Sequence, residues 1–364
     1  MSISRRFFLG GVAASLALSG RALAGDAEDI DPRAAEIMAK TVAVDLHSHA
    51  GGRIRNMLPS RMTAHEYNVG EKMREGRFGV SSFAVIADNP VLKRSGWRVS
   101  ASREPADEEL FNFVTRGLAL LERMREEYGL IKVLSPADVE LAKSSGKSGM
   151  IFAIEGGDFI NGKPERVEWA HGLGLRHLQL VHYRINDLGD IQTEEPRHLG
   201  LSKLGETVVA ECNRLGIIID VAHATKAMTE RVAGLSKTPI LLSHVNVPAP
   251  SGPKPLSRMI SADHAKMVAA TGGVIGVWPS GAAFSNLEEY AQGLARMVEI
   301  VGVDHVGIGS DMDGGIDEVF HSYADYPRLL SAMLRSGFSV DDAAKVVGGN
   351  HARVFAKVTA AVAK

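Results

Sequence analysis

Short apolar runs rich in β-branched residues alternate with helical patterns from residue 41 onward. Eight of these runs are typical of strands: 42–47, 78–87, 150–155, 176–182, 217–222, 239–244, 273–279 and 305–310. Several are apolar on consecutive residues, as in Ile217-Ile218-Ile219, which a parallel strand buried on both faces requires. Eight such strands separated by helices predict an α/β fold, a (β/α)8 barrel of the TIM type.

Helix signals fall between the runs, where a barrel needs them. Residues 107–128 form an amphipathic pattern, Thr225 and Ser261 are suited to N-cap positions, and Ser339 with Asp342 resembles a capping box. Three longer irregular stretches each follow a strand run: 51–75, 88–104 and 183–203. Loops on that side form the active face of such a barrel. A doubly wound open sheet is the alternative, but it lacks support from a Gly-x-Gly-x-x-Gly turn.

The first 24 residues do not belong to this pattern. Arg5 and Arg6 precede an apolar stretch at 10–19, and small residues suited to a signal peptidase follow at 22–24. We interpret residues 1–24 as a twin-arginine signal peptide and residues 25–364 as one catalytic barrel domain. The mature protein is then expected in the periplasm, with an uncleaved N-terminal anchor as the alternative.

Composition narrows the class of protein further. The formal net charge of −2 gives no electrostatic reason to expect a nucleic-acid partner, and no segment after the signal resembles a membrane span. Cys212 is the only cysteine, so it cannot form a disulfide within the chain, even in an oxidising compartment. Because Cys212 lies in the helical pattern 206–215, we expect it to be a packing residue.

Metal-binding or acid–base residues stand at the carboxyl ends of six of the runs: His47 with His49, Glu155, His182, His223, His244 and Asp311. His47 and His49 alternate at a strand end, so both imidazoles point to one side and can bind one ion. Barrel enzymes assemble their sites from the ends of different strands, which predicts one shared site at the mouth. The other eight histidines are expected on the surface or in packing.

Four of these histidines and Glu155 are more ligands than one catalytic zinc uses, since such a site usually keeps about three. Two ions are therefore expected, with the Glu155 carboxylate as their bridge and a hydroxide between them. Imidazole-rich ligation favours Zn²⁺, while manganese, iron and cobalt remain open. Neither a Gly-x-Ser-x-Gly elbow nor a nucleophilic cysteine supports a covalent mechanism.

Seven motifs spread over nearly all of the mature chain occur in a familiar order: Asp45-Leu46-His47-Ser48-His49, Ile154-Glu155-Gly156, 175–182, Asp220-Val221-Ala222-His223, Ser243-His244, 307–314 and 348–355. In this order they resemble the membrane (renal) dipeptidase family, peptidase family M19, within the amidohydrolase superfamily. The resemblance implies a barrel of the metal-dependent hydrolase type and a homodimer. Position 49 departs from the family pattern, because members commonly have His-x-Asp where this chain has His-x-His.

The resemblance also implies roles for individual residues. It gives two ligand sets, one for each ion: His47, His49 and Glu155, then Glu155, His223 and His244. His182 would stabilise the tetrahedral oxyanion, Arg258 would bind the terminal carboxylate of the substrate, and Asp311 would lie near the attacking water and the substrate amine. Arg258 has an alternative interpretation as a surface salt bridge before the helix that begins near Ser261. Trp278, an aromatic residue at a strand end, is expected to line the substrate pocket.

Together these features predict a zinc-dependent dipeptidase that hydrolyses dipeptides, with Asp311 moving the proton. The first alternative is another amidohydrolase activity on the same metal cluster, such as hydrolysis of an N-acyl amino acid, a lactone or a cyclic amide. The second is a non-catalytic periplasmic protein that binds a metal or a peptide. Asp311 discriminates between them, since a pure binding protein does not need a carboxylate poised beside the metals.

Overall fold

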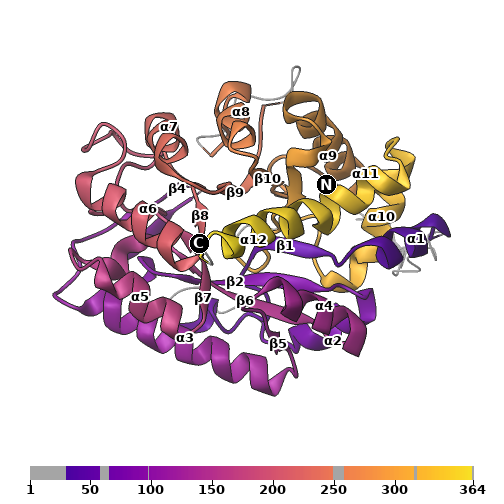
Figure 1. Cartoon of the computed structure of the whole chain (residues 1–364), viewed down its shortest axis with the longest axis horizontal. Helices are drawn as coiled ribbons and strands as arrows, with labels where there is room; N and C mark the ends of the chain where they lie inside the picture. The colour runs from indigo at the N-terminus through magenta and orange to yellow at the C-terminus, as the bar shows by residue number, and fades with distance from the viewer. Residues whose placement is uncertain (1–29, 58–64, 97, 249–257, 315–317, 363–364) are drawn as a thin grey trace, which may run out of the picture.

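The chain folds as a closed barrel of eight parallel strands with helices between them (Figure 1). The computed structural model describes residues 30–57, 65–96, 98–248, 258–314 and 318–362. Its barrel strands are β1 (Val44–Ser48), β2 (Val80–Ile86), β6 (Gly149–Glu155), β7 (Leu175–Gln179), β8 (Ile218–Asp220), β9 (Leu241–Val245), β10 (Val274–Val277) and β11 (Val306–Ile308). Each coincides with one predicted run, so the predicted barrel is confirmed. The signal peptide predicted over residues 1–24 lies outside the described residues.

The barrel closes where β2 pairs with β6. Their parallel register runs from Val80 opposite Gly149 to Ile86 opposite Glu155. Consecutive residues of both strands are buried, as expected for strands covered on both faces. This register places the residues that follow β2 beside Glu155, the last residue of β6. A short strand, β5 (Ile131–Lys132), adds to the start of β6.

The helices lie outside and at the ends of the barrel (Figure 1). They are α1 (Arg33–Lys40), α2 (Val69–Gly76), α3 (Glu109–Glu127), α4 (Pro136–Ser145), α5 (Glu165–Gly172), α6 (Lys203–Leu215), α7 (Lys226–Leu235), α8 (Ala262–Ala270), α9 (Leu287–Val301), α10 (Tyr326–Arg335), α11 (Val340–Ala344) and α12 (Asn350–Ala360). Thr225, Ser261 and Ser339 each accept a hydrogen bond from the backbone N–H three residues later, which confirms the predicted N-caps. Cys212 is buried in α6, as expected. Within the described ranges, every helix is too short or too polar to cross a membrane.

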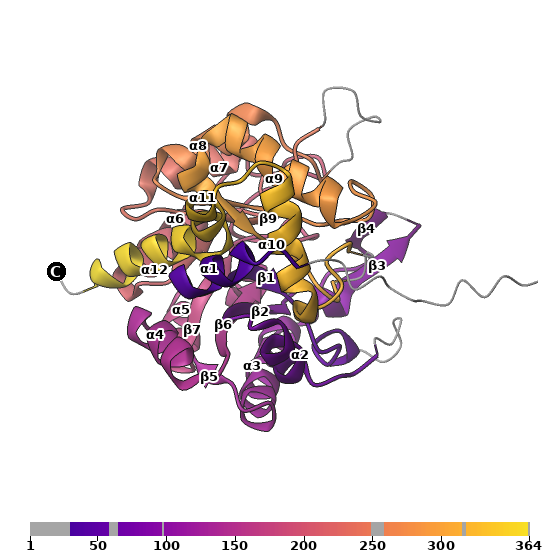
Figure 2. The same ribbon diagram turned by 90° about the vertical axis from the view of Figure 1, so that its right-hand side faces the viewer.

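The stretch 88–104, expected to be irregular, instead contains an antiparallel hairpin of β3 (Leu92–Ser95) and β4 (Arg98–Ala101). Most of the side chains on both strands are at least partly exposed, so the sequence shows no alternation of apolar and polar positions. The hairpin follows β2 and lies at the opposite end of the molecule from α12 (Figure 2). It therefore belongs to the loops at the carboxyl end of the barrel.

Helix α12 closes the amino-terminal end of the barrel. Its Val354, Phe355 and Val358 pack in one buried cluster with the first residues of β1 and β8, Val44 and Ile218. Burying each such side chain stabilises the fold by roughly 1.5–3 kcal/mol. Because apolar packing fills this end, the polar strand-end residues are confined to the opposite end.

Candidate metal centre

The seven residues predicted from the strand ends lie together at the carboxyl end of the barrel: His47, His49, Glu155, His182, His223, His244 and Asp311. The Nε2 atoms of all five histidines lie between 3.3 and 3.8 Å from a carboxylate oxygen of Glu155. Asp311 Oδ1 lies 3.4 Å from His49 Nε2. Apart from Asp311, which is partly exposed, these side chains are buried. The site is a ring of imidazoles around one carboxylate.

Two ligand triads share Glu155. One consists of His47, His49 and Glu155, and the other of Glu155, His223 and His244, with the ligand atoms of each triad within 4.8 Å of one another. These are the two sets implied by the resemblance. A third group of the same size joins Asp311 to His47 and His244, one from each triad. Asp311 is thus close to one histidine of each triad.

The donor atoms fit divalent metal ions. His49 Nδ1 lies 2.8 Å from the carbonyl of Ala84, so it must donate, and its Nε2 lone pair points into the cluster. His244 Nδ1 lies 3.0 Å from the hydroxyl of Ser243, which allows the same orientation. Buried Glu155 Oε2 has no hydrogen-bond partner among the described residues. Buried imidazole nitrogens that face each other and an unsatisfied carboxylate oxygen are the surroundings that a cation would satisfy.

The charges in the cluster are strongly coupled. Burial alone would raise the pKa of Glu155, but His182 and His47 hold it well below its usual range. Burial opposes protonation of His49, yet the neighbouring carboxylates of Asp311 and Glu155 raise its pKa to about 10. Burial lowers the pKa of His223 and His244 well below the usual range. Positive charge is therefore favoured between the two carboxylates, and a metal ion bound there must displace the His49 proton.

Unusual backbone geometry aims the ligands. His223 and Asp311 have left-handed backbones, with φ of 66° and 50°, which is costly for residues other than glycine. Gly309, two residues before Asp311, packs so closely on β9 that a Cβ atom would lie 1.7 Å from the carbonyl of Ser243. Only glycine fits there. This close approach brings the end of β11 against the strand that carries His244.

A buried carboxylate orients His182. Asp88 Oδ1 lies 2.7 Å from His182 Nδ1, and Asp88 Oδ2 accepts a hydrogen bond of 3.0 Å from the backbone N–H of Tyr183. His182 Nε2 then points at Glu155, 3.3 Å away. Burial opposes protonation of His182, but the charges of Asp88 and Glu155 raise its pKa. The raised pKa favours the protonated form of His182, which lies at the edge of the cluster.

Arg258 lies beside the cluster and is buried, which excludes the alternative of a surface salt bridge. Its Nη1 donates to the side-chain oxygen of Gln192, its Nη2 lies 3.5 Å from the carbonyl of His244, and it also interacts with the Tyr183 hydroxyl. Among the described residues, no Asp or Glu pairs with it. A buried guanidinium with neutral partners can accept an anionic ligand.

Trp278 directly follows β10 by sequence and is buried beside the cluster. Its ring meets that of His244 edge-on, with centroids 6.3 Å apart, and its backbone N–H donates to the carbonyl of Val245. The indole N–H has no hydrogen-bond partner within the described part of the chain. Trp278 therefore places an aromatic ring and a buried, unsatisfied donor near the candidate ligands.

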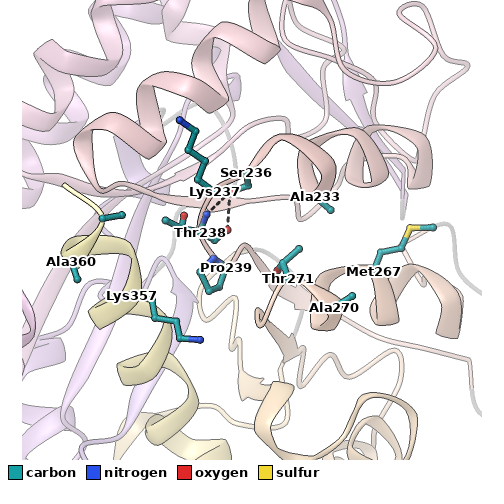
Figure 3. A pocket seen from close by; sticks show the side chains of 11 residues that line it. Ala233, Ser236, Lys237, Thr238, Pro239, Met267, Ala270, Thr271, Lys357 and Ala360 are labelled. Carbon is teal, nitrogen blue, oxygen red and sulfur yellow. Dashed lines mark hydrogen bonds between the residues drawn. The ribbon is translucent and has the colours of Figure 1, made fainter. Parts of the chain in front are cut away.

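A separate hollow of about 730 Å³ lies at the other end of the barrel. Thr238 and Pro239, which precede β9, line it together with residues of α12, including Lys357. Its two lysines, Lys237 and Lys357, point in different directions (Figure 3). The described residues that line this hollow include neither clustered metal ligands nor converging charges, so we assign the chemistry to the strand-end cluster.

Sequence reasoning missed Asp88, Tyr183 and Gln192. Asp88 follows the run 78–87 directly, so the strand-end rule that identified Glu155 could have found it. Tyr183 directly follows His182, so its position near the end of a predicted strand could have identified it by the same rule. Gln192 lies in the long stretch 183–203, where a neutral amide gives no sequence signal.

The fold and the cluster define a metal-dependent hydrolase of the (β/α)8 class. A family model described as membrane dipeptidase (peptidase family M19) matches residues 32–364. The chain therefore belongs to this family, and it is a hydrolase of the metallo-dipeptidase type. Membership in a family of enzymes leaves the non-catalytic binding protein without support.

Individual relatives agree with this assignment. The chain is 30% identical over 325 residues to dipeptidase aclJ of Aspergillus oryzae, covering 82% of this chain and 72% of that protein. It is 25% identical over 358 residues to dipeptidase 3 of Homo sapiens, covering 91% and 68%.

Two solved structures share the fold. One is an amidohydrolase from Pseudomonas aeruginosa, with a TM-score of 0.72 and 23% identity, covering 89% of this chain and 98% of that one. The other is a metallopeptidase from Rhodobacter sphaeroides liganded with a phosphinate mimic of the dipeptide L-Ala-D-Ala. Its TM-score is 0.73 at 23% identity, covering 87% of this chain and 99% of that one.

Proposed function

We propose that this protein is a dinuclear, zinc-dependent dipeptidase that cleaves dipeptides with a free carboxyl terminus. The observation that carries the proposal is the pair of ligand triads that share Glu155. Two divalent ions held there would acidify a water molecule and polarise the scissile carbonyl. The imidazole-rich donor set favours Zn²⁺.

The chain's own side chains supply the remaining parts of a peptide hydrolysis. Asp311, which lies close to a histidine of each triad and is partly exposed, takes the proton of the attacking water and returns it to the leaving amine. His182, whose Nδ1 contacts the carboxylate of Asp88, donates from Nε2 to the carbonyl oxygen as negative charge develops on it. Arg258 binds the terminal carboxylate of the substrate.

Hydrolysis of N-acyl amino acids on the same cluster is the second candidate. His49, in place of the aspartate common in the family, supports it, because it removes one negative charge from the surroundings of the substrate amine. Arg258 can bind the substrate in either reaction, since dipeptides and N-acyl amino acids both end in a carboxylate. A lactone or cyclic amide offers Arg258 no such group.

One experiment decides between these reactions. Metal-loaded protein is assayed against a panel of dipeptides and N-acyl amino acids, and metal content is measured on the same sample. We expect about two ions per chain and faster cleavage of dipeptides. Metal content that never exceeds one equivalent would overturn the dinuclear centre, and faster cleavage of N-acyl amino acids would overturn the dipeptidase assignment.

We propose that the reaction takes place in the periplasm, on the strength of the twin-arginine pattern. Replacing Arg5 and Arg6 by lysine should keep the protein in the cytoplasm, which cell fractionation measures. Equal periplasmic amounts of the variant and the wild type would contradict this route.

A further inference from the structure

Arg258, which binds the substrate carboxylate in the proposed reaction, is surrounded by neutral groups. The guanidinium is buried, yet the groups that contact it are an amide oxygen, a backbone carbonyl and a phenol. A buried charge is usually paired with an opposite charge, because an unpaired one is costly. Within the described part of the chain, no acidic side chain compensates this charge, which lies next to a candidate substrate site.

Gln192 is the residue that orients this guanidinium, and its own backbone is fixed. The N–H of Gln192 donates to the carbonyl of His223 at 2.8 Å, and the preceding Ile191 forms a bridge with Ala224. Gln192 is thus anchored to the segment that carries a candidate metal ligand. Its side-chain oxygen accepts from Nη1 of Arg258. Gln192 therefore helps to hold the guanidinium in place relative to the cluster, together with the His244 carbonyl and the Tyr183 hydroxyl.

We propose that Gln192 is a specificity-determining residue: its neutral amide positions Arg258 and leaves the full positive charge of Arg258 for the terminal carboxylate of the substrate. This inference rests on the proposed function. A glutamate of the same length could make the same hydrogen bond, but it would neutralise Arg258 and repel an incoming carboxylate. An amide positions the guanidinium without competing for its charge.

The test is Gln192→Glu, which changes the charge but keeps the shape. Gln192→Met keeps the approximate length and removes the hydrogen bond. Gln292→Glu, the same chemical change at an exposed position of α9, is the matched control. For each protein, kcat and KM are measured with a dipeptide and with the amide of the same dipeptide, which has the same scissile bond. Inhibition constants are also measured for a phosphinate dipeptide analogue with a free carboxylate and for its carboxamide. They compare binding of the acid and of the amide without turnover.

We expect Gln192→Glu to lower the preference for the free acid over the amide by about 10- to 100-fold, mainly through KM for the acid. Gln192→Met should raise KM for the acid several-fold and leave a clear preference for it, because the charge of Arg258 remains. Gln292→Glu should match the wild type. Metal content should be the same in all four proteins.

Two results would overturn the role of Gln192. One is an unchanged preference between acid and amide in Gln192→Glu, and the other is an equal loss of activity on both substrates, as a structural disturbance would cause. Failure of the proposed function looks different, because the wild type would then cleave neither peptide. In that case the inhibition constants still decide the role of Gln192, since they depend only on binding.

Discussion

Replacing Asp88 by asparagine tests whether His182 depends on its buried carboxylate partner. Asp88 accepts two hydrogen bonds, one from His182 Nδ1 and one from the backbone N–H of Tyr183. Asparagine has one acceptor oxygen, so one of the two donors must lose its partner. Asparagine also removes the negative charge that, with Glu155, raises the pKa of His182.

The size of the effect follows from the hydrogen bond that would be weakened. A bond to a charged group contributes about 1.5–3 kcal/mol, which corresponds to a loss of about 10- to 150-fold in kcat. The loss should depend on pH in a defined direction. A raised pKa keeps the wild-type imidazole protonated to higher pH, so activity that needs this proton is lost as pH rises through the raised pKa. In Asp88→Asn, the same loss should begin at lower pH.

The assay is the pH profile of kcat for the wild type, Asp88→Asn, His182→Ala and the double variant, each with its metal content measured. If Asp88 acts through His182, adding Asp88→Asn to His182→Ala should cost little further activity. Near-normal turnover by Asp88→Asn would refute the positioning role. If Asp88→Asn lowers kcat by the same factor in the wild type and in His182→Ala, Asp88 acts independently of His182.

Three further substitutions test other parts of the molecule. Asp311→Asn should lower kcat by about two to four orders of magnitude with metal content unchanged; near-normal turnover would assign the proton to another group. Glu155→Gln should reduce metal content below that of the wild type, because an amide cannot carry the bridging charge, and full loading of both sites would contradict the bridge. His351 is buried without a hydrogen-bond partner among the described residues, and burial lowers its pKa to about 3. Because the unfolded chain binds this proton below pH about 6.5, His351 should destabilise the fold by about 2 kcal/mol between pH 7 and pH 5. Urea unfolding of His351→Leu should lack this loss, and an equal loss in both proteins would refute the assignment.

The barrel and the positions of the cluster residues could be predicted because both follow from strand periodicity. Consecutive apolar residues, as at Ile217 to Ile219, are required for a strand buried on both faces, and the carboxyl ends of such strands meet at one end of a barrel. Once the runs are aligned, Glu155 and His244 are neighbours without any knowledge of the loops. Chemistry at the strand ends is therefore accessible from the sequence alone.

Contacts made by the loops could not be predicted in the same way. The approach of Gln192 to Arg258 depends on the path of two long segments, and nothing in either sequence specifies the pairing. The β3–β4 hairpin escaped prediction because its exposed strands have no apolar face. Asp88 is an intermediate case. Its position directly after β2 could be predicted, but its contact with Nδ1 of His182 depends on the registers of β2 with β6 and of β6 with β7.

The charge around the cluster bears on which substrates the protein prefers. Glu155 and Asp311 are the carboxylates among the candidate ligands, and His49 adds no negative charge. Two divalent ions with a hydroxide between them would leave a centre with about one net positive charge, to which buried Arg258 adds from one side. Such a centre attracts the carboxylate of a dipeptide and repels its ammonium group, so Asp311 has to offset the ammonium as well as move the proton. An N-acyl amino acid keeps the carboxylate and lacks the ammonium. His49 should therefore reduce the difference in kcat/KM between dipeptides and N-acyl amino acids. Assays of both substrate classes on the same protein measure this difference.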